Sequence, residues 1–187
     1  MKTINYIIDD FFVGKKCFVE NLDFSEKENY FFSKDPSFYR RYTLELGLDI
    51  CILRLDMKEE VLLNQLKSLN PLFYTRVLEI TSKESNAEIK ISHNDGFIPT
   101  SLTISEKQKL RCFWFSFSSR WLENKALAAE EYVEKFSIPC KEISIPQNPY
   151  FHTLYNEIFD IADKTPLDNF KLKLKLYAFL DLLMLSL

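Results

Sequence analysis

The hydrophobic period of this chain changes once, near residue 118, and that change limits the folds the chain can adopt. Before this point, apolar and polar residues alternate, which is the two-residue period of a half-buried strand. After it, apolar residues recur at steps of three and four, as they do along one face of a helix. We therefore expect a β-rich part followed by a helical part.

Several stretches of the first part carry strand signals. Two alternating runs are joined by a turn at Gly47, and the segment HNDG at 93–96 provides a second strong turn signal. Many short strands separated by turns are typical of a sandwich or a small barrel. The predicted strands lie at 39–46, 50–57, 71–80, 87–92, 97–104 and 108–118.

The last of these strands, QKLRCFWFSFS, contains four aromatic residues and has two bulky faces. A central strand packed on both sides explains this pattern, and so does a strand with one face lining a ligand cavity; the two interpretations are compatible. A surface for stacking bases would place aromatic residues among basic ones, which are few here. Alternation puts Arg111, Phe113, Phe115 and Phe117 on one face, and Leu110, Cys112, Trp114, Ser116 and Ser118 on the other.

Composition excludes several kinds of chemistry. The net charge of −3 does not favour nucleic-acid binding by this chain's own surface, because phosphate neutralisation needs a basic excess. Three glycines and no GxxxxGK or GxGxxG motif argue against a phosphate-binding loop. Two histidines, His93 and His152, are too few for the metal site of a barrel enzyme. We expect no metal, no cofactor and no catalysis.

The four cysteines are widely spaced and form no CxxC pair, so we expect reduced, buried thiols instead of a zinc site. The N-terminus carries Asp9 and Asp10 where a signal peptide would be apolar. No run of about 18 apolar residues occurs. These features predict a cytoplasmic protein without a membrane partner.

The second part reads as helices with one short strand. We expect helices at 126–136 and 149–162 and a strand at 140–146. A last helix of about 20 residues should begin near Thr165, which with Asp168 forms a variant capping box. Its apolar residues cover more than one face, so it needs two partners, for which the preceding helix and a second copy of the chain are the candidates. Because the apolar run stops at Leu187, we expect more protein downstream in the native gene.

The order of these parts resembles the N-terminal sensor and dimerisation domain of AraC-type transcription regulators. In that family a strand of the pattern I-x-F-S-x-x-W-L leaves the barrel, and FSFSSRWL is similar, with Phe115 where the pattern has Ile. The segment LELGLDICILRLDM resembles the family's E-x-G-L strand pair. The run LKLKLYAFLDLLML, with Asp181 as its acidic residue, resembles the helix that leads to the DNA-binding part.

This resemblance implies an α+β fold with a small cupin-like jelly-roll barrel over 1–146, including short helices near 119–136, and an antiparallel helical pair over 147–187. It implies a homodimer, a small-molecule effector, and DNA binding only through a helix-turn-helix domain that this chain does not contain. Two alternatives stay open: a stand-alone module that binds a ligand or a protein, and a metal-free barrel enzyme.

Alternation along the strands suggests which residues line a ligand pocket. Among them, Arg76 is the one basic residue in an apolar run, so it is a candidate for an anionic ligand group; an outward arginine on a solvated face is the simpler alternative. The predicted pocket residues are Tyr42, Leu53, Leu55, Tyr74, Arg76, Phe113 and Phe115. The predicted dimer seam consists of Phe170, Leu174, Tyr177, Phe179, Leu180 and Met184, with packing inside one chain as the alternative.

Overall fold

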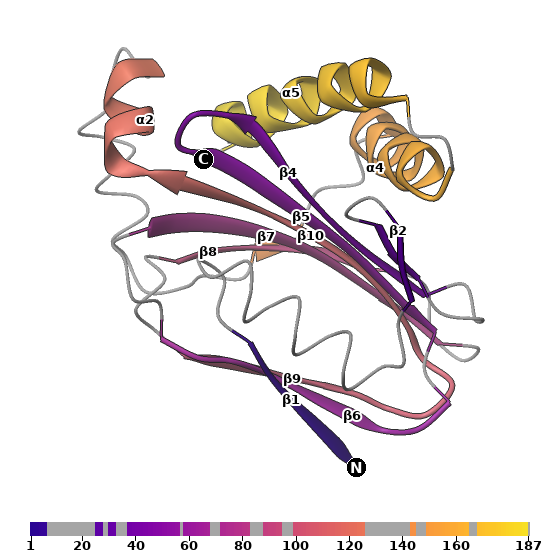
Figure 1. Ribbon diagram of the computed structural model, residues 1–187. Coiled ribbons are helices and arrows are strands. Elements are labelled where there is room, and N and C mark those ends of the chain that lie inside the picture. The colour runs from indigo at the N-terminus through magenta and orange to yellow at the C-terminus, as the bar shows by residue number, and fades with distance from the viewer. Residues whose placement is uncertain are drawn as a thin grey trace. The chain divides into compact units, whose positions relative to one another are not determined.

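The aromatic run around Trp114 forms a long strand, β10 (Lys109–Ser118), inside the larger of two sheets. In this computed structural model, β10 pairs antiparallel with β5 (Leu48–Asp56) on one side and with β7 (Leu72–Thr81) on the other (Figure 1). Residues 112–117 of β10 are all buried. The prediction of a central strand packed on both sides is confirmed.

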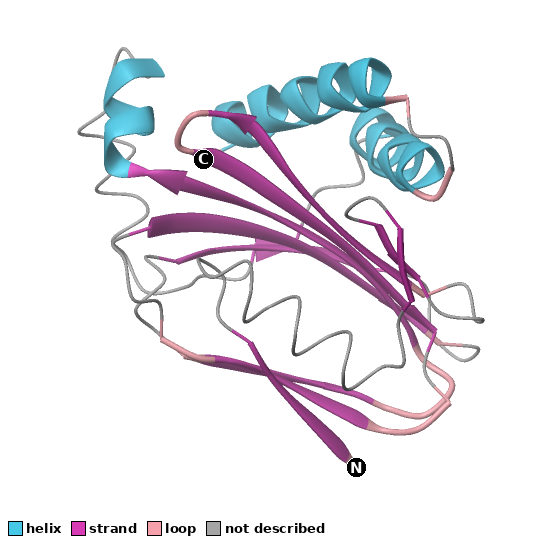
Figure 2. Cartoon of the chain, in the orientation of Figure 1, coloured by secondary structure: helices cyan, strands magenta, loops and turns pink. Residues whose placement is uncertain are grey.

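The chain divides into two compact units, Met1–Ser144 and Ile145–Leu187; the sequence suggested a boundary after residue 146. Strands dominate the first unit, and the second contains two helices among its described residues (Figure 2). The structure describes residues 1–6, 25–27, 30–32, 37–56, 58–67, 72–82, 88–94, 99–125, 143–144, 149–164 and 168–186.

The larger sheet has the strand order β11-β8-β7-β10-β5-β4-β3-β2, and every neighbouring pair is antiparallel. Strands were expected at 39–46, 50–57, 71–80, 87–92 and 108–118, and each of these stretches overlaps a strand of this sheet. Its remaining strands are β2 (Ser25–Lys27), β3 (Tyr30–Phe32), β4 (Phe38–Glu45), β8 (Glu88–Asn94) and β11 (Ile143–Ser144).

The smaller sheet has three strands in the order β1-β6-β9. β1 (Lys2–Tyr6) runs parallel to β6 (Val61–Gln65), and β9 (Thr100–Ile104) runs antiparallel to it. Only β9 was among the strands predicted from the sequence. Ile4, Val61, Leu63 and Ile104 of this sheet are buried in one cluster with side chains of the larger sheet.

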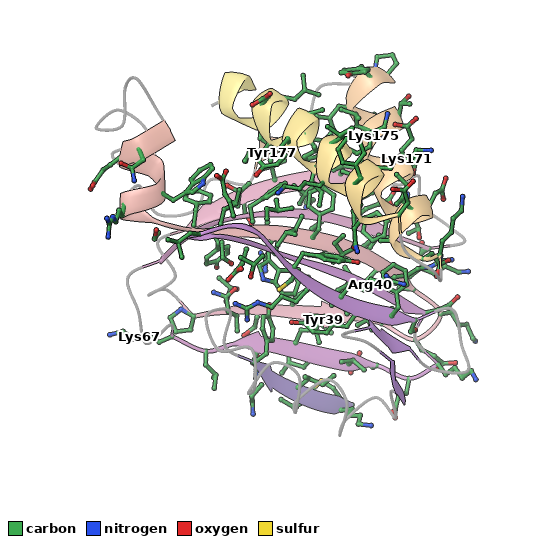
Figure 3. The ribbon with its side chains drawn as sticks, turned by 45° about the horizontal axis from the view of Figure 1, so that its top comes forward. Tyr39, Arg40, Lys67, Lys171, Lys175 and Tyr177 are labelled. Atoms are coloured by element: carbon green, nitrogen blue, oxygen red, sulfur yellow. The ribbon has the colours of Figure 1, made fainter. Side chains whose placement is uncertain are left out.

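We call the face of the larger sheet that packs on the smaller sheet its inner face. Buried side chains of β10 on this face are Leu110, Cys112 and Trp114, so the predicted division of the strand into two faces is confirmed. Consecutive residues of β4 show the same alternation, because Tyr39 belongs to the inner cluster and Arg40 lies on the opposite side (Figure 3). Phe113, Phe115 and Phe117 are fully buried on the outer face.

The mixed α+β class predicted from the sequence is confirmed. The two sheets are separate, since no described strand pairs with strands of both, and the arrangement is not a closed barrel. Two sheets that pack face to face bury their apolar inner faces without closing into a barrel. The cupin-like jelly roll implied by the resemblance therefore stays a proposal.

β10 leads directly into helix α2 (Ser119–Lys125). The Ser118 hydroxyl accepts a hydrogen bond from the Trp121 backbone N–H at 3.1 Å, so Ser118 caps this helix. The backbone N–H of Ser118 also donates to the Gly47 carbonyl at 3.0 Å, which joins the start of α2 to the turn between β4 and β5. The helix expected at 126–136 lies outside the described residues.

The second unit consists of α4 (Pro149–Ala162) and α5 (Asn169–Ser186). The predicted apolar face of α4 is confirmed, because Phe151, Leu154, Tyr155, Ile158 and Ile161 are all buried. Phe179 of α5 packs on Phe151, with ring centroids 4.4 Å apart, and on Tyr155 at 6.5 Å. An ion pair of 2.6 Å between Lys175 of α5 and Glu157 of α4 also joins the two helices.

The last helix begins later than predicted. Thr165, the expected cap, lies outside the described residues, and Asp168 caps α5 instead by accepting from the Lys171 N–H at 2.9 Å. No helix in the described part of the chain is long and apolar enough to cross a membrane.

Gly47 provides a direct test of this fold. Its φ of +85° is one that other residues rarely adopt, and a Cβ there would lie 2.6 Å from the Ser118 hydroxyl oxygen. We predict that Gly47→Ala lowers the free energy of unfolding by about 2 kcal/mol, measured by urea denaturation. Leu46→Ala is the control, because Leu46 in the same turn is 95% exposed and its loss should have little effect. Equal stabilities of the two variants would contradict the described turn.

Candidate functional site

The inner face of the larger sheet carries a lateral row of polar side chains centred on a tryptophan. Trp114 is paired with Arg76 on β7 and with Cys51 on β5. Because directly paired residues of neighbouring strands point to the same face, the row continues to Ser92 on β8 and Arg41 on β4. We call these five residues the tryptophan row: Ser92, Arg76, Trp114, Cys51 and Arg41.

The next row on the same face is also polar, whereas the rows on the other side are mainly apolar. Ser116 is paired with Tyr74 and with Asp49, and Asp49 with Thr43. In the opposite direction, Cys112 lies between Leu78 and Leu53, and Leu110 between Ile80 and Leu55. The inner face therefore has a polar end and an apolar end, and the polar end is the candidate site.

Arg76 points into the space between the two sheets. Its Nε donates to the Ser92 hydroxyl at 3.3 Å, and its Nη1 donates to the Thr100 hydroxyl of the smaller sheet at 3.5 Å. The Arg76 charge also acts on the Tyr6 phenol: burial raises the pKa of Tyr6 well above its usual range, and the guanidinium opposes that rise. The simpler interpretation of Arg76, an outward arginine on a solvated face, is therefore wrong.

A chain of hydrogen bonds connects Arg76 back to its own strand through the smaller sheet. The Thr100 hydroxyl donates to the Gln65 side-chain oxygen at 3.3 Å. The Gln65 amide donates to the Tyr74 hydroxyl at 2.7 Å. Gln65 and Tyr74 are almost fully buried, so these bonds satisfy groups that water does not reach. The network holds the two sheets in one register at the polar end.

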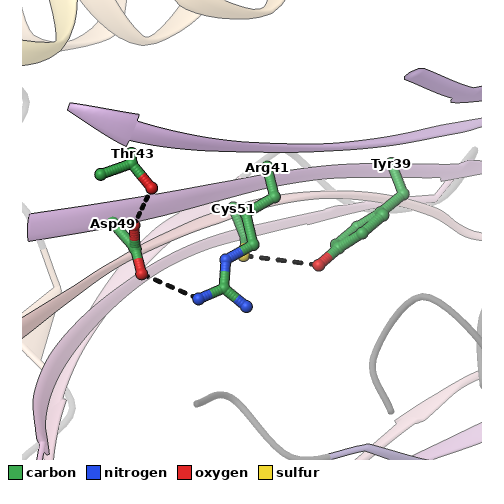
Figure 4. A network of polar contacts seen from close by, with 5 residues as sticks. All are labelled: Tyr39, Arg41, Thr43, Asp49 and Cys51. Atoms are coloured by element: carbon green, nitrogen blue, oxygen red, sulfur yellow. Dashed lines mark hydrogen bonds and ion pairs between the residues drawn. The ribbon is translucent and has the colours of Figure 1, made fainter. Parts of the chain in front are cut away.

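Arg41 anchors the other end of the tryptophan row (Figure 4). Its guanidinium forms an ion pair with the Asp49 carboxylate at 2.8 Å, and the Thr43 hydroxyl donates to the same carboxylate at 2.6 Å. The Tyr39 hydroxyl lies 3.5 Å from the Cys51 sulfur. Tyr39, Arg41 and Cys51 project from the same side of the sheet, toward the interior.

Both thiols on this face are held in the protonated form. Burial raises the pKa of Cys51 to about 11, against the nearby charge of Arg41. Burial likewise raises the pKa of Cys112 to about 12, against the charge of Arg76. A thiol with so high a pKa is a poor nucleophile at neutral pH, so neither Cys51 nor Cys112 is suited to nucleophilic chemistry in this environment.

Trp114 occupies the middle of the row with its ring 6.1 Å from that of Tyr6, centroid to centroid. The side chain is 4% exposed. In the described part of the chain, its indole Nε1–H is buried and has no hydrogen-bond acceptor. A buried donor without an acceptor costs about 1–3 kcal/mol, so such a group requires an explanation.

The predicted pocket residues fall on two faces of the same sheet. Leu53, Leu55, Tyr74 and Arg76 lie on the inner face. Phe113 and Phe115 lie on the outer face, as does Tyr42, which is paired with Ile50. Leu53 is paired with Cys112, so Phe113, the next residue of β10, points to the opposite face. The two sets of residues therefore cannot line one site. The seven residues are therefore not brought together.

Sequence reasoning missed several residues that make up the site. Arg41 follows Arg40 directly in the sequence, and alternation separates the two onto opposite faces of the sheet. Gln65 and Thr100 come from the smaller sheet, whose position depends on long-range pairing. Trp114 was assigned to the correct face, and its pairing with Arg76 was the missing information.

The residues of the predicted dimer seam differ in exposure. Phe170 is 74% exposed and Leu174 is 54% exposed, while Tyr177 is half-buried. Phe179 and Leu180 are buried, and Phe179 packs inside the helical pair, which matches the alternative of packing within one chain. The side chain of Met184 lies outside the described residues.

Comparison with protein-family models, with curated proteins and with solved structures gave no match. Among the described residues, no group of three or more histidine, cysteine, aspartate or glutamate side chains is arranged to hold a metal ion.

The two inner thiols make the burial of the site testable. In a Cys17→Ser/Cys140→Ser variant, we predict that iodoacetamide alkylates Cys51 and Cys112 at pH 8 at least about a hundredfold more slowly in the native protein than in urea, since a pKa of about 11 instead of 9.0 lowers the thiolate fraction by that factor. Mass spectrometry of timed samples measures the rates. Native labelling at the rate seen in urea would show that the inner face is open to solvent.

Proposed function

We propose that the chain is the effector-binding and dimerisation module of an AraC-type transcription regulator, with the DNA-binding domain encoded downstream. The β-rich unit, for which we propose a cupin-like jelly-roll fold, supplies the effector site. The helical unit supplies the contact with a second copy. The observation that carries the proposal is a stripe of apolar side chains on α5, two of them mainly exposed and one half-buried, with exposed charges of opposite sign beside it.

The stripe consists of Phe170, Leu174 and Tyr177, which follow one another at steps of four and three residues. Side chains at these steps lie on the same face of a helix. Phe170 and Leu174 are among the few large apolar residues of the described chain that are mainly exposed. A row of them on one helix is the kind of surface through which proteins associate.

The charges beside the stripe suggest how two copies meet. Lys173 and Asp181 are exposed, and they lie four residues before and four residues after Tyr177. If two α5 helices pair antiparallel around a two-fold axis at Tyr177, Lys173 of each copy faces Asp181 of the other. An isologous interface requires this kind of self-complementarity, because the same patch serves both copies.

A dimer of this kind links an effector to DNA. Paired half-sites on DNA mirror the two-fold axis of a dimeric regulator. An effector changes the presentation of the DNA-binding domains only if it binds two arrangements of the dimer with different affinities. In this proposal the β-rich unit senses the effector, the helical unit transmits its binding, and the chain performs no catalytic step.

The charge pattern of α5 allows a sharp test of the dimer. We predict that Asp181→Lys and Lys173→Asp each raise the dimer dissociation constant by about tenfold, because each places like charges together at two symmetric positions. The double variant should recover most of the affinity. Sedimentation equilibrium at low salt measures all three, and Asp160→Lys, an exposed change on α4, is the matched control.

Two outcomes would overturn the dimer. One is a monomer at every concentration for the unaltered chain. The other is a dimer that survives Leu174→Glu, since this change places a carboxylate in the middle of the stripe. Equal effects of Asp160→Lys and Asp181→Lys would show that net charge, and not the antiparallel register, governs association.

A further inference from the structure

Trp114 is not the only buried indole with an unpaired N–H, but its surroundings are distinctive. Trp121 also has a buried Nε1–H without an acceptor in the described residues, and its ring packs against Phe117 at 5.8 Å. Trp114 instead lies directly beside a guanidinium, since it is paired with Arg76. The indole N–H and the guanidinium, which come from neighbouring strands, both bind negatively charged oxygen.

The spacing within the row matches a small planar anion. Neighbouring strands lie about 4.8 Å apart, so side chains of paired residues on one face are close enough for one carboxylate to meet both. A carboxylate has two oxygens and accepts from an indole N–H and a guanidinium at the same time. Charge-assisted hydrogen bonds of this type are stronger than neutral ones, and burial strengthens them further.

We propose that the effector is a small carboxylate, with one carboxylate oxygen accepting from the Trp114 Nε1–H and the other paired with the Arg76 guanidinium. This inference rests on the proposed effector-binding role and names the chemical class of the effector. The apolar part of the molecule extends toward Cys112 and Leu78, where the inner face becomes apolar. Thr100 and Gln65 orient Arg76 and are positioning residues.

Tryptophan fluorescence tests this proposal, because the chain has two tryptophans. In Trp121→Phe, Trp114 is the only tryptophan, and in Trp114→Phe it is Trp121. We predict a saturable change in the fluorescence of Trp114, and none in that of Trp121, on titration with acetate or benzoate at constant ionic strength. Acetamide and benzamide, which have the same shape without the charge, should give no response.

Two arginine variants separate a role of the site from a general effect of charge. Arg76→Gln should weaken carboxylate binding by at least about tenfold, the size expected for a lost charge-assisted hydrogen bond. Arg54→Gln changes an arginine on the outer face of the same sheet, since Arg54 is paired with Arg111, and should leave affinity unchanged. Circular dichroism checks that each variant is folded, and a rise in the melting temperature of the unaltered chain with benzoate gives a second readout.

The proposal is overturned if folded protein gives no saturable response to either carboxylate, if the amides act equally well, or if Arg76→Gln binds as tightly as the unaltered chain. A water molecule as the partner of the indole N–H predicts the first of these results. Failure of the dimer is a separate outcome, because α5 is tested by sedimentation without added carboxylate. A dimer that binds no carboxylate would support the proposed dimerisation and rule out a carboxylate as the effector.

Discussion

The pairing of β10 with both β5 and β7 is the constraint on which the rest of the β-rich unit depends. One register places Trp114 between Cys51 and Arg76, and every other residue of the inner face follows from it. A shift by one residue would exchange the faces, so the phenylalanines of β10 would meet the smaller sheet and the polar row would leave the interior. Because both faces of β10 are buried, this exchange would disturb the packing on both sides of the strand. The register is therefore strongly specified.

That register explains how the unit accommodates charge beside its core. Arg41 shares its charge with Asp49, and Arg76 donates to hydroxyls of both sheets. Burying a charge is unfavourable unless it is paired and hydrogen-bonded, and Arg76 meets this need through Ser92 of β8 and Thr100 of β9, the second of which is held by Gln65 of β6. The same arrangement places the Trp114 indole N–H beside the Arg76 guanidinium. These are the two groups to which we propose that the effector binds.

Alternation along one strand can be read from the sequence, and the two faces of β10 were predicted correctly for this reason. Pairing between distant strands cannot be read in this way. Leu53 and Phe113 both look like inward residues of their own strands, yet the register pairs Leu53 with Cys112 and separates the two onto opposite faces. The buried face of α4 was predicted from its helical spacing, whereas the burial of Phe179 depends on which side of α5 meets α4.

The central claim is that this chain senses an effector for a regulator whose DNA-binding part is encoded after it. Sequencing the native gene beyond the codon for Leu187 tests this claim most directly. The account predicts an open reading frame that continues for about 100 residues, with two helix-turn-helix patterns and an excess of basic residues. A stop codon at that point, or a continuation without a DNA-binding pattern, would contradict the regulator and favour a stand-alone binding module.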